Sequence, residues 1–393
     1  MIPRLRLKPG EHRVLAGSPW VYRGELPHAA LTAAEPGSVV EVEDVHGRFI
    51  GRGFFNPASV IAVRLLTRAR EEAVDAGLIR RRLAEAAHWR RIAAAGREAY
   101  RVVNAESDGL PGLIVDRYGR WLVVEVLSLG MAAFLPVVLE SLVEHFAPAG
   151  IYERGESAVR AKEGLPLQSG VRYGEVPEQV LIHEYELEWT VNVRGGQKTG
   201  HYLDQYANRL AAAAYAPGRA VFDVFCHSGS FGLLALARGA DSLVGVDIDA
   251  DAVNLAAANA RRNRLDPSRW RFEAANAFDW LRHESDQGPH YDLGILDPPA
   301  FTKSPDTVER AVRGYKEINL RALKLLRPGG VLVTSSCSYH LSPDAFLGVL
   351  ASAAHDARRR VRVLEWRGQG PDHPYLPALP ETRYLKCAIL AVD

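Results

Sequence analysis

The pattern of hydrophobic and polar positions changes twice along the chain. Residues 1–70 carry short apolar runs interrupted by Gly and Pro, which is typical of the strands of a small β-barrel. Residues 71–98 change to a roughly helical spacing of apolar positions that ends at Gly96, and this predicts a helical connector. The positions at this spacing are Leu78, Leu83, Ala86, Ala87 and Ile92.

The rest of the chain falls into two further segments. Residues 99–185 mix strand patterns with one apolar stretch of helical length, and they predict a central α+β domain. From about residue 186 to residue 393, strand and helix patterns alternate, which indicates βαβ units and a parallel sheet. The strand candidates are 220–225, 242–248, 270–275, 291–297 and 329–336. We therefore expect an α/β fold whose ligands lie at the carboxyl ends of these strands.

Composition excludes several classes of protein. A chain of 393 residues is expected to hold two or three domains. Its longest apolar runs are far shorter than a membrane span, and residues 1–10 lack the apolar core of a signal peptide. The only cysteines, Cys226, Cys337 and Cys387, have no paired spacing. This argues against a disulfide frame or a metal site and favours a reducing cytoplasm.

The net charge of +1 does not by itself indicate a nucleic-acid partner. Residues 1–100 carry 16 Lys and Arg against 11 Asp and Glu, so a local basic face is one interpretation. A solvated, arginine-rich surface explains the same excess, and the charge count does not separate the two.

A turn after the first predicted strand of the parallel sheet suggests a cofactor loop. Asp223 lies in that strand, and the turn "CHSGSFG" contains Gly229 and Gly232 but lacks the G-x-G-x-x-G pattern of a dinucleotide site. Asp247 ends the second strand, where a carboxylate can accept both hydroxyls of a ribose. Asn276 follows the third strand, and its side-chain carbonyl could accept from an adenine amino group.

This ordered set describes S-adenosylmethionine (SAM) better than NAD, because a loose glycine loop suits a cofactor without phosphates. The alternative is a parallel α/β domain in which Asp223 caps a helix and the glycines only turn the chain.

The segment "DPPAF" ends the fourth predicted strand. Asp297 is followed by two prolines that cannot continue a ladder, so the turn is stiff. A carboxylate and the ring of Phe301 beside a cofactor site would suit a flipped base, which needs one edge to bond and one face to stack on. The alternative places Phe301 in the core. The motif also appears in amino-group methyltransferases, so it does not define the target atom.

Cys337, in "SSCSYH", narrows the chemistry. Adding a thiolate to carbon 6 of a pyrimidine makes carbon 5 nucleophilic, and cysteine both attacks and leaves well. The strand at 329–336 is expected beside the strand at 291–297, so that Cys337 and Asp297 face one pocket. A buried structural cysteine is the alternative, and it is our interpretation for Cys226 and Cys387.

At these residues the chain resembles the bacterial 23S rRNA cytosine-5 methyltransferases that carry an N-terminal PUA domain. The resemblance runs along the whole chain and rests on an ordered series of segments. These are "GSPWVYRGEL", "GRFIGRGFFNPAS", "GLPGLIVDRYG", "YERGESAVRAKEGL", "GGQKTGHYLDQYANR", "DVFCHSGSFG", "DPPAFTKS", "RGYKEINL", "SSCSYH" and "DHPYLPALPETRYLK".

The resemblance implies a PUA domain at 1–70 for RNA binding and a class I, Rossmann-like catalytic domain that uses SAM. It implies Cys337 and Asp297 as the catalytic pair. The cofactor site assigned on this basis comprises Thr199, Tyr202, Gln205, Asp223, Phe225, Ser228, Gly229, Asp247, Ile248, Asn276, Ala277 and Asp297. The RNA site comprises Pro298, Phe301, Lys303 and Arg313.

Several positions depart from the family pattern. Asn276 stands where an Asp is usual, Tyr206 stands where an Arg usually follows "LDQ", and Cys226 and His227 replace small or aromatic residues. Ala300 stands where some RNA cytosine methyltransferases carry a second cysteine. Proton release from carbon 5 therefore needs another base, for which the candidates are His340 and water.

Three hypotheses follow for the function. The first is SAM-dependent methylation of carbon 5 of a cytosine in large-subunit rRNA. The second is an amino-group or guanine RNA methyltransferase on the same fold, and the third is a non-catalytic rRNA-binding assembly factor. Cys337 separates the first from the second, whereas the intact loop with Asp247 and Asp297 argues against the third. The oligomeric state is not readable, and a homodimer is left open.

Overall fold

The computed structural model describes residues 2–196, 198–302 and 305–393, and the chain divides into two compact units. Unit 1 holds the chain up to Ile182, together with Val191–Leu203 and Pro371–Thr382. Unit 2 holds His183–Thr190, Asp204–Gly370 and Arg383–Asp393. Two late segments, 191–203 and 371–382, thus pack within unit 1, an exchange that the predicted division at 70, 98 and 185 did not include. The four predicted segments and their three boundaries stay a prediction.

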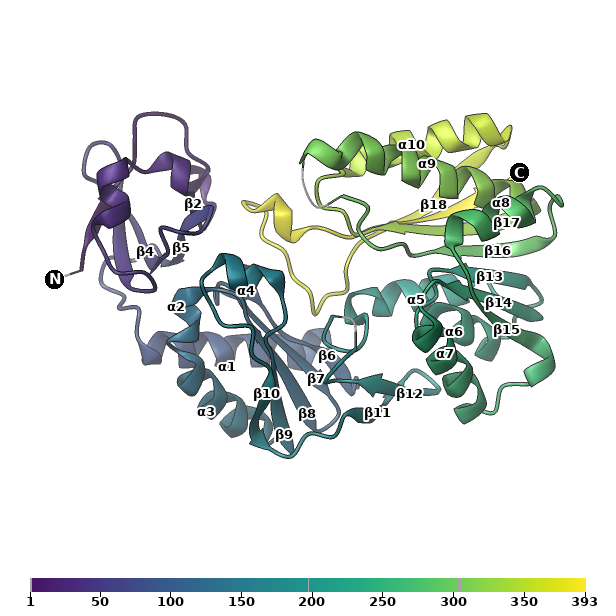
Figure 1. Cartoon of the computed structure of the whole chain (residues 1–393), viewed down its shortest axis with the longest axis horizontal. Helices are drawn as coiled ribbons and strands as arrows, with labels where there is room; N and C mark the ends of the chain where they lie inside the picture. The colour runs from purple at the N-terminus through teal and green to yellow at the C-terminus, as the bar shows by residue number, and fades with distance from the viewer. Residues whose placement is uncertain (1, 197, 303–304) are drawn as a thin grey trace. The chain divides into compact units, whose positions relative to one another are not determined.

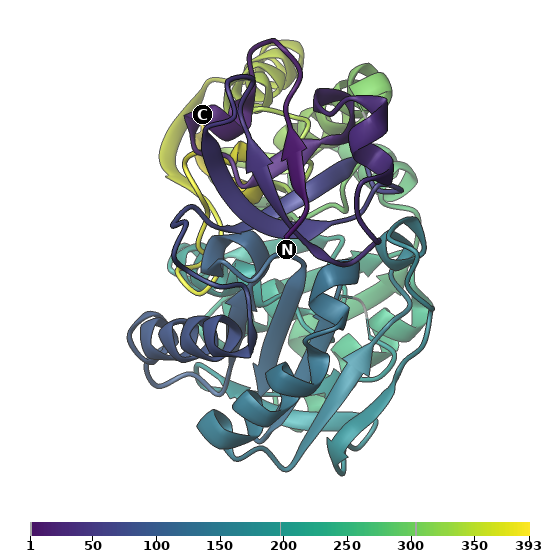
Figure 2. The same cartoon turned by 90° about the vertical axis from the view of Figure 1, so that its left-hand side faces the viewer.

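Unit 1 begins with a curled five-stranded sheet, seen in Figure 2. Its strands are β1 (Arg4–Arg6), β2 (Trp20–Tyr22), β3 (Val39–Glu43), β4 (Phe49–Phe55) and β5 (Ile61–Thr67), in the order β1-β3-β4-β5-β2. The pairs are antiparallel except β1 with β3. Val40, Val42, Phe55 and Val63 fill its core, so the apolar runs interrupted by Gly and Pro became strands as predicted.

A helix and a second sheet complete most of unit 1. Helix α1 (Ala76–Ala93) begins where the Asp75 carboxylate accepts from the Leu78 N–H. Leu78, Leu83, Ala86 and Ala87 are buried as the spacing predicts, but Ile92, in the last turn, is 63% exposed. Figures 1 and 2 show α1 beside α3 (Leu135–Phe146), and both contribute to the core under the sheet.

The second sheet of unit 1 has the order β10-β9-β8-β7-β6. Its strands are β6 (Ala99–Asn104), β7 (Leu113–Tyr118), β8 (Trp121–Val126), β9 (Gly150–Arg154) and β10 (Gly170–Gly174). Only β8 and β9 pair in parallel, because α2 (Leu129–Ala132) and α3 cross between them. Helix α4 (Ala158–Lys162) follows, and a two-stranded sheet of β11 (Gln179–Glu184) and β12 (Leu187–Asn192) leads the chain into unit 2.

Unit 2 is built on a seven-stranded sheet in the order β15-β14-β13-β16-β17-β19-β18. Its strands are β13 (Ala220–Val224), β14 (Ser242–Asp247), β15 (Trp270–Ala274), β16 (Tyr291–Leu296), β17 (Leu326–Ser336), β18 (Val361–Arg367) and β19 (Lys386–Val392). The first five are the predicted parallel strands, and this Rossmann-like arrangement confirms the expected α/β fold. The antiparallel β18 and β19 were not predicted.

Helices cover both faces of this sheet, as Figure 1 shows. One face carries α5 (Tyr206–Ala213), α6 (Ser230–Ala237) and α7 (Ala250–Arg262), and the other carries α8 (Ala277–Ser285), α9 (Val308–Leu325) and α10 (Pro343–Ala357). The strand order reverses between β13 and β16, so the loops after them open at the switch point where such sheets bind ligands.

Short 3-10 helices join these elements. They span Arg13–Ala16, Arg23–Glu25, His28–Thr32, Ala105–Asp108, Leu203–Gln205, Pro267–Arg269, Pro305–Thr307 and Pro380–Thr382. Among the described residues, no helix has the length and apolar character needed to traverse a bilayer.

Candidate active site

The loop after β13 has an unusual backbone. Phe225 and His227 adopt positive φ angles of 68° and 46°, although neither is a glycine, and Gly229 follows with a φ of 81°. The N–H groups of Phe225 and Cys226 both donate to the carbonyl of Val246 at the end of β14 (2.9 and 3.0 Å), which holds the loop against that strand. Left-handed conformations of non-glycine residues are costly, and they concentrate where a ligand has to be met by the main chain.

Asp223 places a buried carboxylate beneath this loop. Its Oδ2 accepts from the N–H of Gly232 (2.9 Å), whereas Oδ1 is buried and has no hydrogen-bond partner among the described residues. Burial raises the pKa of Asp223 to about 7, and the neighbouring carboxylates of Asp297 and Asp247 add to the rise. A buried acceptor without a donor, close to two further carboxylates, fits a ligand that brings a positive charge and hydrogen-bond donors.

Asp247 lies at the end of β14 and orders the same loop. Its Oδ2 accepts from the N–H of His227 (2.9 Å), and its Oδ1 accepts from the N–H of Asp249 (3.0 Å). Each carboxylate oxygen can accept a second hydrogen bond, so Asp247 can still receive ribose hydroxyls. Ile248, the next residue, is 72% exposed and offers an apolar surface beside that carboxylate.

Asn276 has a local task that the sequence did not reveal. Its Oδ1 accepts from the N–H groups of Phe278 (2.9 Å) and Asp279 (3.4 Å), so the side chain is the N-cap of α8. This carbonyl was predicted to accept from adenine, but the structure commits it to the helix. The role of Asn276 toward a cofactor stays a prediction, as does that of the buried Ala277 that follows it.

Gln205 joins the loop before α5 to the end of β16. Its Nε2 donates to Asp297 Oδ1 (2.8 Å) and to Ser335 Oγ (3.3 Å), and its Oε1 accepts from Asn208 Nδ2 (2.6 Å). Gln205 is buried, so these contacts hold the half-buried Asp297 carboxylate in one orientation. The sequence placed Gln205 with the cofactor but did not predict its contact with Asp297.

The "DPPAF" turn and Cys337 come together as predicted. Strand β17 pairs in parallel with β16, and Cys337 follows directly after β17. The thiol Sγ of Cys337 lies 3.8 Å from the carbonyl oxygen of Pro298, which it can reach as a donor. The expected adjacency of the two strands is therefore confirmed, and the thiol lies against the turn that follows Asp297.

The three cysteines have different environments. Cys226 and Cys387 are 4% and 0% exposed. Burial raises the pKa of Cys387 to about 12 and raises the pKa of Cys226 well above its ordinary value. Cys337 is half-buried, so it is the cysteine with access to solvent and to a substrate.

The residues assigned to RNA binding differ in their exposure to solvent. Phe301 is half-buried among aromatic rings, with its centroid 4.5 Å from that of Tyr315 and 5.8 Å from that of Phe278. This packing supports the core interpretation of the ring more than an open stacking platform. Arg313 is exposed on α9, Pro298 is buried, and Lys303 lies outside the described residues.

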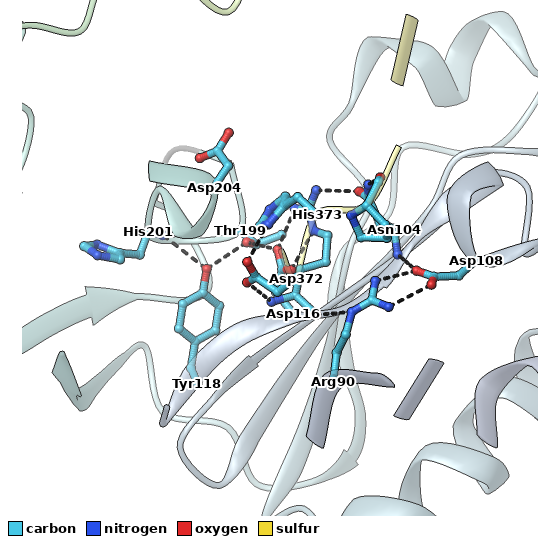
Figure 3. A network of polar contacts seen from close by, with 12 residues as sticks. Arg90, Asn104, Asp108, Asp116, Tyr118, Thr199, His201, Asp204, Asp372 and His373 are labelled. Atoms are coloured by element: carbon cyan, nitrogen blue, oxygen red, sulfur yellow. Dashed lines mark hydrogen bonds and ion pairs between the residues drawn. The ribbon is translucent and has the colours of Figure 1, made fainter. Parts of the chain in front are cut away.

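Thr199 and Tyr202 belong to unit 1, within Val191–Leu203. Figure 3 shows Thr199 between two buried side chains: its hydroxyl donates to Asp116 Oδ2 (2.5 Å) and lies 2.8 Å from the Tyr118 hydroxyl. The Tyr118 oxygen also accepts from the N–H of His201 (3.2 Å). The structure therefore anchors the "KTGHY" segment in unit 1, and the cofactor roles of Thr199 and Tyr202 stay predictions.

Two more residues at the loop complete the assigned set. Phe225 is half-buried, with its ring edge-on to that of Phe301 at 6.2 Å, and Ser228 is buried, with its carbonyl accepting from Asn259 Nδ2 (3.3 Å).

The sequence analysis missed Lys386. The signal that could have found it is a lysine within the apolar run "YLKCAIL".

Comparisons with known proteins identify the family of the chain. A family model described as a PUA-like domain matches residues 5–68, and one described as an S-adenosylmethionine-dependent methyltransferase matches residues 142–379. A protein of Shewanella denitrificans named ribosomal RNA large subunit methyltransferase I is 40% identical over 396 residues, which is all of both chains. The protein of that name from Salmonella arizonae is 39% identical, with 98% of this chain and 96% of the relative covered.

Solved structures show the same fold. A Streptococcus mutans protein described as a SAM-dependent methyltransferase superposes with a TM-score of 0.85 at 20% identity, with all of both chains covered. A methyltransferase in complex with S-adenosylhomocysteine gives a TM-score of 0.86 at 19% identity, again over the full length of both chains. Since the methyltransferase model covers more than half of the chain and the named relatives cover nearly all of it, the protein belongs to the family of S-adenosylmethionine-dependent methyltransferases that carry a PUA-like domain.

Proposed function

We propose that this enzyme methylates carbon 5 of a cytosine in large-subunit (23S) rRNA in the bacterial cytoplasm, and that Cys337 is the nucleophile. The observation that carries the proposal is the half-buried Cys337 thiol, 3.8 Å from the Pro298 carbonyl in the turn after Asp297. The names of the full-length relatives support the rRNA substrate. We assign the PUA-like residues 5–68 to RNA binding without a part in the chemistry.

The carboxyl edge of the sheet carries hydrogen-bond acceptors and an apolar side chain that suit SAM. We assign the ribose hydroxyls to Asp247 and an apolar contact to the exposed Ile248. The unpartnered oxygen of Asp223 would accept from a cationic group, and the left-handed turn at Gly229 lets the main chain approach the cofactor. When bound, SAM supplies the electrophilic methyl group.

The protein's own side chains then do the following. The Cys337 thiolate forms a bond to carbon 6 of the cytosine, and the electron pair of the 5,6 double bond makes carbon 5 nucleophilic. Asp297, oriented by Gln205, bonds the ring or amino nitrogen of the base, and in its protonated form its carboxyl gives the ring nitrogen a proton or hydrogen bond that offsets the negative charge that develops on the ring. After carbon 5 is methylated, its proton leaves to a base, the double bond reforms and the carbon–sulfur bond breaks to return the thiolate.

The test is a covalent adduct on an RNA that carries 5-fluorocytosine at the target. Because fluorine cannot leave as a proton does, the bond to Cys337 should persist and give a slow band on a denaturing gel when SAM is present. The native protein, Cys226→Ala and Cys387→Ala should give this band, and Cys337→Ala should not. A band that survives in Cys337→Ala would overturn the assignment. Methylation that continues in that variant would instead establish amino-group chemistry.

A further inference from the structure

Lys386 is a buried cation in the seven-stranded sheet of unit 2. It is the first residue of β19, is 3% exposed, and stands between the buried Leu385 and Cys387. The strand register pairs it with Ser336, the last residue of β17 and the one before Cys337. A lysine is rarely buried to this degree unless a partner or a function requires its charge.

The ammonium group is held by carbonyl oxygens. Its Nζ donates to the carbonyl of Ser338 (2.6 Å) and to that of Tyr384 (2.9 Å). In the described part of the chain, no carboxylate lies within ion-pairing distance of this nitrogen. Two carbonyls accept two of the three N–H groups, but they do not neutralise the charge.

Ser338, the residue after Cys337, is fixed by several contacts. Its carbonyl also accepts from the N–H of Leu341 (3.1 Å), and its hydroxyl lies 2.9 Å from the Tyr315 hydroxyl. The Thr302 N–H donates to the same hydroxyl (3.4 Å). The main chain on the far side of Cys337 is therefore immobilised, with the bond from Lys386 as its shortest tether.

We propose that Lys386 is a positioning residue for Cys337: it fixes the Ser338 carbonyl and supplies the positive charge that stabilises the thiolate when the thiol attacks and when it leaves. The proposal rests on Cys337 being the nucleophile. A cation in a low-dielectric setting lowers the pKa of a nearby thiol, and it also stabilises the thiolate as a leaving group.

The other titratable groups around Cys337 explain why such a charge is needed. Asp297 directly follows β16, the strand that pairs with β17, and a negative charge there would repel a thiolate at Cys337. Burial raises the pKa of Tyr315, on α9, and the pKa of Cys387, on β19, so both stay neutral near pH 7. Burial lowers the pKa of Lys386 to about 8, and the nearby Cys337 opposes that fall. Lys386 is thus the cation that faces the thiol among these groups.

The experiment measures the alkylation rate of Cys337 by iodoacetamide in the free, full-length protein from pH 5.5 to 10, with peptide mass spectrometry to separate the three cysteines. In the native protein the reactivity should rise with a midpoint below the ordinary thiol value of about 8.5. In Lys386→Met the midpoint should rise by about one unit or more, so that the rate at pH 7 falls about tenfold. Lys386→Arg, which keeps the charge, should recover most of the native rate.

Lys316→Met is the matched control, because that lysine pairs with Asp356 at the surface of unit 2 (2.7 Å) and should leave the profile unchanged. SAM affinity and the thermal unfolding midpoint report whether each variant is folded. Equal alkylation midpoints in the native protein and in a folded Lys386→Met would overturn the proposal. If that variant does not fold, a native alkylation midpoint at or above pH 8.5 would overturn it. Loss of the 5-fluorocytosine adduct in the native protein would instead refute Cys337 as the nucleophile, which the alkylation profile does not test.

Discussion

Replacing Gln205 by glutamate tests whether the Asp297 carboxylate has to be held in place. The change keeps the size and shape of the side chain but exchanges the donating Nε2 for an oxygen. The bonds to Asp297 Oδ1 (2.8 Å) and Ser335 Oγ (3.3 Å) lose their donor, whereas Asn208 can still donate to the remaining oxygen. The substitution thus removes the donor to Asp297 and brings two carboxylates together, whereas the Ser335 hydroxyl can turn and donate to the new carboxylate.

The magnitude follows from these contacts. The lost hydrogen bond to the charged Asp297 carboxylate contributes about 1.5–3 kcal/mol, and repulsion between the two adjacent carboxylates adds about 1 kcal/mol. Gln205→Glu should therefore lower the free energy of unfolding by about 2–4 kcal/mol at pH 8. If the same loss appears in the transition state, methyl transfer should slow by about 30-fold to 900-fold.

The pH dependence gives the result its sign. Two adjacent carboxylates raise each other's pKa, so at lower pH one of them holds a proton and can donate to the other. The ratio of variant to native activity should consequently fall as the pH rises from 6 to 8.

The assay combines urea denaturation with single-turnover methyl transfer from labelled SAM to a 23S rRNA fragment. Gln179→Glu, at an exposed position of β11, is the control and should change stability by less than about 0.5 kcal/mol. If Gln205→Glu were as stable and as active as that control, Gln205 would not be the group that orients Asp297.

Three further perturbations test neighbouring parts of unit 2. Burial raises the pKa of Asp223 to about 7, above the value near 4 of an unfolded aspartate, so the stability that the native carboxyl provides is complete below pH 4 and is lost as the pH rises to 7. As the pH rises from 5 to 8, Asp223→Asn should therefore become more stable relative to the native protein in urea titrations without SAM. A difference in the free energy of unfolding that does not change with pH would contradict this. Glu184→Gln removes one partner of a fully buried ion pair and should cost about 3–5 kcal/mol, whereas Glu186→Gln at an exposed pair should cost less than about 1 kcal/mol; equal losses on denaturation would refute the burial argument. Gly229→Ala forces a φ of 81° on an alanine whose Cβ would lie 3.1 Å from a neighbouring methyl group. Gly218→Ala has a similar backbone strain in open space and should lower the free energy of unfolding by roughly 1–2 kcal/mol, so Gly229→Ala should lower it further. Calorimetry should show that SAM binding is lost only in Gly229→Ala.

The sequence predicted which candidate residues lie at the strand ends, because these positions depend on local patterns. Each of Asp223, Asp247 and Asp297 stands in or next to a short apolar run, and parallel strands place such positions at one edge of the sheet. The pairing of β16 with β17 followed from the same rule, and with it the approach of Cys337 to the "DPPAF" turn. These predictions needed only the order of strands and helices.

Other features depend on contacts that periodicity does not encode. The spacing placed Ile92 on the buried stripe of α1, but the last turn carries it into solvent. An asparagine at position 276 is compatible with both an adenine contact and a helix cap, and only the direction of the chain after β15 shows that Asn276 caps α8. The anchoring of Thr199 by Asp116 and Tyr118 joins positions about 80 residues apart, which a single sequence cannot show.

The assignment of the nucleophile illustrates how the two sources of evidence combine. Residue type admitted three cysteines, and motif position favoured Cys337 without excluding Cys226, which lies in the cofactor loop. The structure distinguishes the three cysteines by their burial, because burial raises the pKa of Cys226 and Cys387 and keeps both thiols away from an RNA base. It also adds a cation that no motif suggested. A buried lysine without a carboxylate partner costs stability, and the proposed Cys337 thiolate would give the charge of Lys386 a purpose in the strand beside it.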